Sequence, residues 1–159
     1  MSGKMKRIWA PWRKVFLCKK EKGCIFCNKS KDNNDTQNHI LERYETVFVI
    51  MNIYPYNNGH LMIVPYRHVN KLNSLTEKEM KDMFYALKKW ERILETKFKP
   101  HGFNIGLNIG RAAGAGFRHF HWHIVPRWNG DSNFMPVIGS TKVINDSLNS
   151  CYEYLKKEI

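Results

Sequence analysis

The segment from His119 to Pro126 reads His-Phe-His-Trp-His-Ile-Val-Pro, so histidines alternate with large apolar residues. A period of two is the period of a β-strand, which places the three imidazoles on one face and the apolar side chains on the other. Imidazole can be a nucleophile, a general acid or base, or a metal ligand near neutral pH. The alternatives are a chance cluster and a metal patch exposed on a sheet. The aromatic backing and the glycines before the segment favour chemistry.

Two short apolar runs precede it, at Thr46 to Asn52 and at Leu61 to Val64, and a turn-rich link joins them. They predict an antiparallel pair of strands. Phe103 to Ile109 predicts a further strand, and the polar stretch 28–38 predicts a loop.

A capping box at Thr76-Glu77-Lys78-Glu79 predicts the start of the main helix, which ends near Pro100. Apolar residues then recur at steps of three and four and predict its core face: Met80, Met83, Phe84, Leu87, Trp90 or Glu91, Leu94 and Phe98. A last amphipathic helix is predicted from Lys142 to Lys157. The order strands, helix, strands, helix predicts an α+β fold with an antiparallel sheet.

The length of 159 residues predicts a single domain over 1–159, with residues 1–22 as a basic and aromatic N-terminal arm. No apolar run reaches membrane-spanning length, and charges interrupt the N-terminus where a signal region would lie. We therefore expect a cytoplasmic protein without a membrane partner. Its four cysteines are then reduced or metal-bound. The net charge of +12 favours polyanions such as nucleotides, or nucleic acid without specificity, although most of the lysines read as solvated surface.

The stretch from Asn108 to Gly116 is rich in glycine and directly precedes the histidines. Successive backbone amides in such a loop can bind an anion. The loop feeds a strand, so it is neither a P-loop nor a dinucleotide-binding turn. Arg111 and Arg118 are candidates to contact outer phosphates, with solvated surface arginines as the alternative.

Cys24-Ile-Phe-Cys27 has the spacing of a metal knuckle, which needs two more ligands for tetrahedral zinc. The alternatives are a redox pair and two reduced thiols. A redox pair normally precedes a helix in a βαβ unit, and that context is missing from the pattern.

The pattern His119-Phe-His121-Trp-His123-Ile-Val resembles the histidine triad (HIT) family, and the resemblance extends over Asn52, Gly59-His60, Pro65 to His68 and Asn108 to Gly116. It implies nucleotidyl transfer through a nucleotide bound covalently to His121, with His123 contacting the phosphate. It also implies substrate contacts from the following residues: Asn52, His60, Asn108, Gly114, Ala115 and Gly116. Taken alone, Asn52 reads as a turn former, His60 as a buried structural hydrogen bond and His123 as support for its neighbour.

In relatives that carry the cysteine pair, two histidines complete a structural zinc site. The resemblance therefore implies zinc held by Cys24, Cys27, His68 and His119, which keeps His119 out of the reaction. Family members are commonly homodimers, so a homodimer is implied as well.

Arg7 to Arg13 and Pro126 to Met135 resemble the bacterial diadenosine tetraphosphate phosphorylase branch of the family. This implies cleavage of diadenosine tetraphosphate or related dinucleoside polyphosphates by inorganic phosphate. Only Phe117-Arg118 separates Gly116 from His119, one residue fewer than that branch leads us to expect. Hydrolysis of the same substrates therefore stays open. So do a purine-nucleoside phosphoramidase and a nucleotide-binding module without enzymatic activity.

Overall fold

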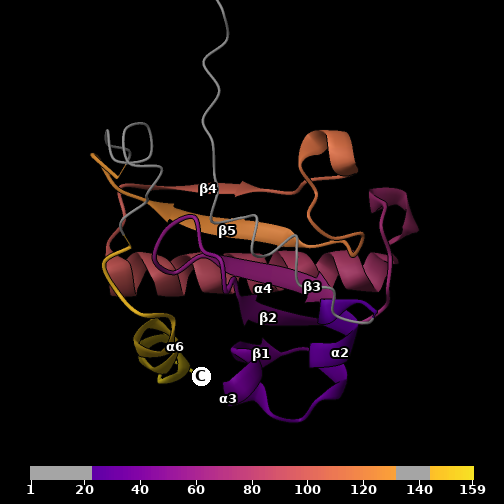
Figure 1. Ribbon diagram of the computed structural model, residues 1–159, viewed down its shortest axis with the longest axis horizontal. Helices are drawn as coiled ribbons and strands as arrows, with labels where there is room; N and C mark the ends of the chain where they lie inside the picture. Colours follow the sequence, from indigo (N-terminus) through magenta and orange to yellow (C-terminus); the bar gives the residue numbers. More distant parts are fainter. Residues whose placement is uncertain (1–22, 132–143) are drawn as a thin grey trace, which may run out of the picture.

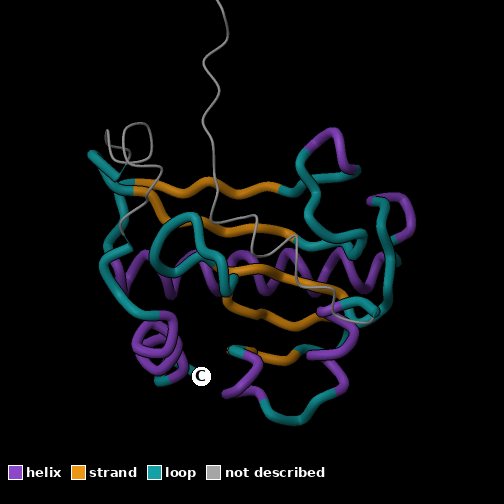
Figure 2. The backbone as a smooth tube through the Cα atoms, in the orientation of Figure 1, coloured by secondary structure: helices purple, strands orange, loops and turns teal. Residues whose placement is uncertain are grey.

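A computed structural model describes residues 23–131 and 144–159. Five antiparallel strands form one sheet in the order β1-β2-β3-β5-β4, and the long helix α4 lies along one face (Figures 1 and 2). The strands are β1 Ile40–Arg43, β2 Val47–Met51, β3 Leu61–Pro65, β4 Gly102–Gly106 and β5 Trp122–Arg127. The helices are α2 Ile25–Lys31, α3 Asp35–Asn38, α4 Glu77–Phe98 and α6 Leu148–Lys156, with 3-10 turns at Leu72–Ser74 and Arg111–Ala113. The α+β prediction is confirmed, and the expected arm over 1–22 lies outside the described residues.

Helix α4 begins as predicted. Thr76 accepts a hydrogen bond from the Glu79 amide, and the Glu79 carboxylate accepts one from the Thr76 amide. The buried face is narrower than predicted and consists of Glu79, Met83, Ala86, Trp90 and Leu94. Met80 and Phe84 are 38% and 61% exposed, because 3.6 residues per turn rotate them towards the edge of that face. In the described part of the chain, no helix is long and apolar enough to cross a membrane.

Strands β2 and β3 are buried along their whole length, because both faces of the sheet are covered. Val49 and Ile63 pair across the strands and pack with α4 and α6, whereas Phe48 and Met62 pack on the other face with Phe26 of α2. This second apolar layer holds α2 against the sheet, where Phe26 also contacts the rings of His119 and His121.

The N-terminal polar stretch differs from its prediction as a loop, because it contains most of α2 and all of α3. Arg43 holds this region in place by an ion pair of 2.7 Å to Asp35 and by hydrogen bonds to the carbonyls of Ser30 and Asp32. Arg43 lies on β1, a strand that the sequence pattern did not reveal, so local propensity alone could not predict the two helices.

Two further boundaries differ from prediction. The last helix starts after an N-cap at Ser147 instead of at Lys142, and its predicted first residues 142–143 lie outside the described part. Strand β5 starts only at Trp122, so His119 and His121 precede it. The expected single strand through all three histidines is therefore wrong.

Candidate active site

The three histidines are divided between two places. The Phe120 amide donates to the Val69 carbonyl at 2.7 Å, and the Phe120 ring is buried in the core, which fixes the backbone just before β5. From there the His119 ring turns towards Cys24, the N-cap residue of α2, and Cys27 within that helix. His121 and His123 face a cavity, with ring centroids 4.8 Å apart. One histidine thus belongs to a candidate metal site and two belong to a candidate reaction site.

His121 is buried and held in one tautomer. Its Nδ1 lies 2.6 Å from the backbone oxygen of His119, so the Nδ1–H group donates to that carbonyl. Burial lowers the pKa of His121, and the hydrogen bond to the carbonyl opposes that shift only in part. The neutral ring therefore carries its proton on Nδ1 and an unshared electron pair on Nε2, which is the state that a nucleophile needs.

His123 is fixed by a chain of hydrogen bonds through His60. The Tyr56 amide donates to Nδ1 of His60 at 3.0 Å, so the proton of a neutral His60 is on Nε2. That Nε2 lies 2.9 Å from Nδ1 of His123 and donates to it. A neutral His123 therefore carries its proton on Nε2, opposite to the tautomer of His121.

His60 differs from the expectation of a substrate contact. It is fully buried and lies behind His123, whereas the cavity wall is formed by other residues. The alternative of a buried hydrogen bond describes its geometry better.

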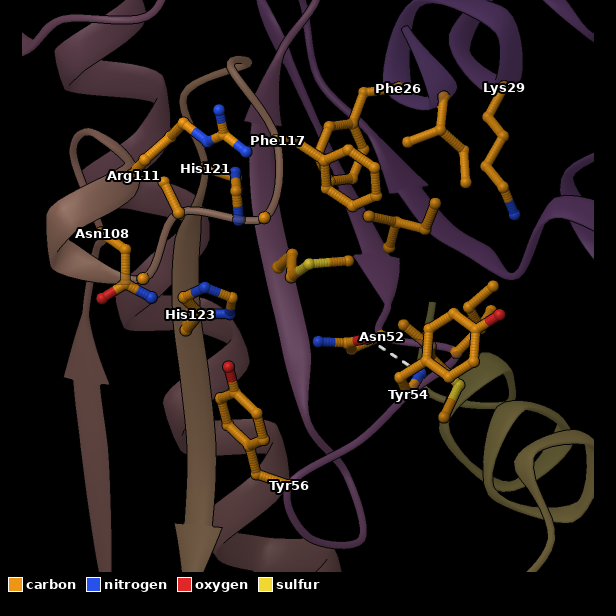
Figure 3. Close-up of a pocket in the computed structure, with 18 residues that line it drawn as sticks. Phe26, Lys29, Asn52, Tyr54, Tyr56, Asn108, Arg111, Phe117, His121 and His123 are labelled. Atoms are coloured by element: carbon orange, nitrogen blue, oxygen red, sulfur yellow. Dashed lines mark hydrogen bonds between the residues drawn. The ribbon is translucent and has the colours of Figure 1, made fainter. Parts of the chain in front are cut away.

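The cavity has a volume of about 270 Å³ and lies between α2, the end of β2 and the glycine-rich loop (Figure 3). It brings together most of the residues that the sequence had singled out for nucleotide chemistry: Asn52, Asn108, Gly114, Ala115, Gly116, His121 and His123. Gly114 has φ +85°, a left-handed conformation that glycine adopts without strain, and this turn directs the loop back over the cavity.

The side chain of Asn52 contacts Tyr54 and His60. Its Oδ1 accepts a hydrogen bond from the Tyr54 amide at 2.9 Å, so it forms a turn at the strand end. Its Nδ2 lies 3.4 Å from Nδ1 of His60. Figure 3 shows its side chain between the two histidines and Tyr54. The turn role and a place in the cavity wall are therefore compatible.

The side of the cavity next to α2 is apolar, and sequence reasoning missed it. Phe26 packs against Phe117 and His121 with ring centroids 5.3 and 5.1 Å apart. Further apolar lining comes from Ile25, Ile50, Met51, Ile53 and Met62. This wall suits a flat aromatic ring such as a nucleobase. One sequence feature pointed to this wall: Phe26 lies between Cys24 and Cys27, and a metal knuckle there would fix the position of its side chain.

The three arginines near the histidines have different environments. Arg111 lines the cavity, and Figure 3 shows it close to His121. Arg118 is exposed. Arg127 forms a bidentate ion pair with Asp131, with both N···O distances 2.7 Å, and also donates to Asn104. Arg111 is therefore the arginine best placed to meet a bound phosphate.

Four residues form a candidate metal centre: Cys24, Cys27, His68 and His119. Their ligand atoms lie within 4.8 Å of one another, and Nδ1 of His119 is 3.2 and 3.6 Å from the two sulfur atoms. In tetrahedral zinc the S···N separation is about 3.6 Å, calculated from the usual bond lengths. Nε2 of His119 donates to the Pro65 carbonyl at 2.8 Å, which leaves the Nδ1 electron pair for a metal. The donor set and the tautomer therefore fit a closed four-ligand metal site.

A five-stranded antiparallel sheet with paired histidines over a cavity at β5 defines a histidine triad fold. The chain belongs to the HIT family: the model of the HIT domain matches residues 33–130. The predicted family is confirmed.

Comparisons with individual proteins agree with the assignment to the HIT family. The chain is 36% identical, over 97% of its length and 84% of the relative's, to AP-4-A phosphorylase of Mycobacterium tuberculosis. A histidine triad nucleotide-binding protein of Sulfolobus tokodaii has a similar structure, with TM-score 0.67 and 27% identity over 84% of this chain and 87% of the other. A Zn-bound histidine triad family protein of Mycobacterium smegmatis has TM-score 0.68 and 24% identity over 85% and 91%, which supports the fold alone.

Proposed function

We propose that the protein is an enzyme that cleaves diadenosine tetraphosphate or related dinucleoside polyphosphates, and that it transfers the nucleotidyl group to inorganic phosphate. The single observation that carries this proposal is the tautomer of His121, whose buried ring presents an unprotonated Nε2 to the cavity. The 36% identity to an AP-4-A phosphorylase over nearly the whole chain supports the choice of substrate.

The reaction proceeds in two displacements. Nε2 of His121 attacks the α-phosphorus, a P–N bond forms, and the bond to the bridging oxygen breaks. The Nε2–H group of His123 donates to that bridging oxygen, and the leaving group departs as ATP. An oxygen of inorganic phosphate then attacks the adenylyl group, releases Nε2 of His121 and gives ADP.

The nucleotide lies along the cavity in an order set by the lining. The base packs in the apolar part beside Phe26 and Phe117, and the ribose lies near Asn52. The α-phosphate meets His121, Asn108 and the backbone of the loop at 114–116, whose amides donate to its oxygens.

The four-ligand site holds structural zinc in this proposal. Such a closed site supplies stability and no open coordination position for chemistry. It ties α2, which forms one wall of the cavity, to the segment that carries His121.

Product analysis on diadenosine tetraphosphate, with and without inorganic phosphate, tests the reaction. We expect phosphate to raise the rate and the products to be ADP and ATP. AMP and ATP at a rate independent of phosphate would identify a hydrolase, with His121 in the same role. Cleavage of adenosine 5′-phosphoramidate alone would identify a phosphoramidase. Salt-sensitive nucleic acid binding without turnover would identify a binding module.

We further propose a homodimer of single-domain subunits in the cytoplasm. Strand β4 is at an edge of the described sheet, and Ile109, just after that strand and outside both cavities, is 42% exposed. Unpaired edge strands with apolar side chains are surfaces on which chains associate. A light-scattering mass of one subunit would contradict the dimer.

A further inference from the structure

A second cavity, of about 420 Å³, adjoins the first where His123, Asn108 and Tyr56 line both. Its other walls come from β4 and β5, so we name it the β4–β5 groove. Resting on the proposed nucleotidyl transfer, we propose that the β4–β5 groove binds the leaving nucleoside polyphosphate.

The direction of the reaction points to this groove. In phosphoryl-type displacements the attacking and leaving atoms are roughly in line through the phosphorus. A group displaced by Nε2 of His121 therefore departs on the side away from that ring. Of the two histidines, His121 lines only the first cavity, whereas His123, the proton donor to the leaving oxygen, lines both.

The first cavity has room for one half of the substrate. Its volume of about 270 Å³ is below the ~300–1,000 Å³ that pockets for a single small ligand usually have. A dinucleoside polyphosphate carries two nucleosides, so its second half needs a separate surface beyond His123.

The floor of the groove is built by the pairing of β4 with β5. Gly106 pairs with His123 and Asn104 with Val125, so these residues lie beside one another on the sheet. A Cβ atom at Gly106 would meet no heavy atom within 4 Å, which means that the missing side chain leaves open space. The glycine lets the leaving group approach the backbone of β4 in the groove beyond His123.

Polar groups at the far end suit phosphate oxygens. Arg127 donates to Asn104 Oδ1, which leaves the Asn104 amide NH₂ as a donor towards the groove. Asp131 holds the Arg127 guanidinium and offsets its charge. The groove therefore offers oriented hydrogen-bond donors and little net positive charge. Binding of moderate strength suits a product that must leave after each turnover.

Gly106→Val tests the groove by filling it, and Gly102→Val is the matched control. Both glycines are on β4, a Cβ at either would meet nothing within 4 Å, and valine favours strands. Gly106 lines the groove and Gly102 lies four residues away, outside its lining. Both variants are first checked for the wild-type mass in solution, because β4 is an edge strand.

The readouts are kcat/KM on diadenosine tetraphosphate and on adenosine 5′-phosphoramidate, which transfers the same nucleotide but has a small leaving group. We expect Gly106→Val to lower kcat/KM on diadenosine tetraphosphate about tenfold or more. Its kcat/KM on the phosphoramidate should stay within about twofold of wild type. Gly102→Val should leave both within about twofold of wild type. An equal loss on both substrates, or no loss on either, overturns the proposal.

Binding measurements separate this inference from the proposed function. A methylene-bridged, non-cleavable diadenosine tetraphosphate should bind the wild type more tightly than AMP, and Gly106→Val should remove that difference. If the wild type is inactive on both substrates but shows this pattern, the reaction is wrong and the groove is right. Equal affinity for AMP and the analogue in the wild type overturns the groove.

Discussion

Nδ1 of His121 lies 2.6 Å from the backbone oxygen of His119, while the ring of the same His119 faces the sulfur atoms of Cys24 and Cys27. One residue thus takes part in the candidate metal centre through its side chain and fixes the proposed nucleophile through its main chain. This is possible because His119 and His121 precede β5 and do not follow its alternation, so their rings turn to different sites.

His121→Ala should lower kcat/KM on diadenosine tetraphosphate by several orders of magnitude, because it removes the Nε2 atom that forms the covalent bond. The check is trapping of a labelled nucleotide on acid-quenched protein, which should succeed on wild type and fail on the variant. His101→Ala, at an exposed histidine outside both cavities, is the matched control and should retain labelling. Substantial activity in folded His121→Ala would rule out the covalent mechanism.

His60→Phe should lower kcat by about 10²-fold with little change in KM, because His123 loses the partner that keeps its proton on Nε2. His60→Gln can donate from its amide to the same Nδ1 and should restore part of the loss. A structural role alone would make both variants lose stability and activity together. Equal kcat in wild type and His60→Phe would show that His123 needs no such support.

The sequence alone predicted the elements whose signals are local. The capping box at Thr76 and Glu79 and the strand pair around Val49 and Ile63 are present as expected. Asn108 and His121 also come together, because the loop and the histidine segment are adjacent in the chain.

The features that the sequence did not predict depend on contacts between distant residues. Helices α2 and α3 are held by Arg43, and the apolar wall of the cavity depends on Phe26 reaching His121 across 95 residues of chain.

Glu79→Gln should lower the free energy of unfolding by about 1–2 kcal/mol at pH 7, because Glu79 closes the capping box and pairs with Arg67 at 2.7 Å. The Arg67 guanidinium holds the pKa of Glu79 at about 2, against an ordinary value of 4.5. Its contribution is complete above pH 4.5 and is lost as the pH falls towards 2, because the unfolded chain takes up the proton first.

Urea unfolding from pH 3 to 7 measures this effect as a difference between wild type and Glu79→Gln, in which contributions common to both cancel. The difference should shrink on acidification. Glu77→Gln, at an exposed glutamate in the first turn of the same helix, should show a smaller difference. A constant difference for Glu79→Gln across this range would show that its ionisation does not stabilise the fold.

Cys24→Ser and Cys27→Ser should each reduce bound zinc from about one per chain towards zero and destabilise the protein, because a metal bound only by the folded chain adds its binding energy to folding. Elemental analysis of protein purified without added metal gives the stoichiometry, and Cys18→Ser is the control that should keep it. Chelation of the wild type should lower the melting temperature in the same direction. Because the His119 carbonyl holds His121, the metal-depleted protein should also lose covalent labelling. Wild type that is purified without metal, and is stable and fully labelled, would instead leave His68 and His119 as a hydrogen-bonded cluster with two thiols.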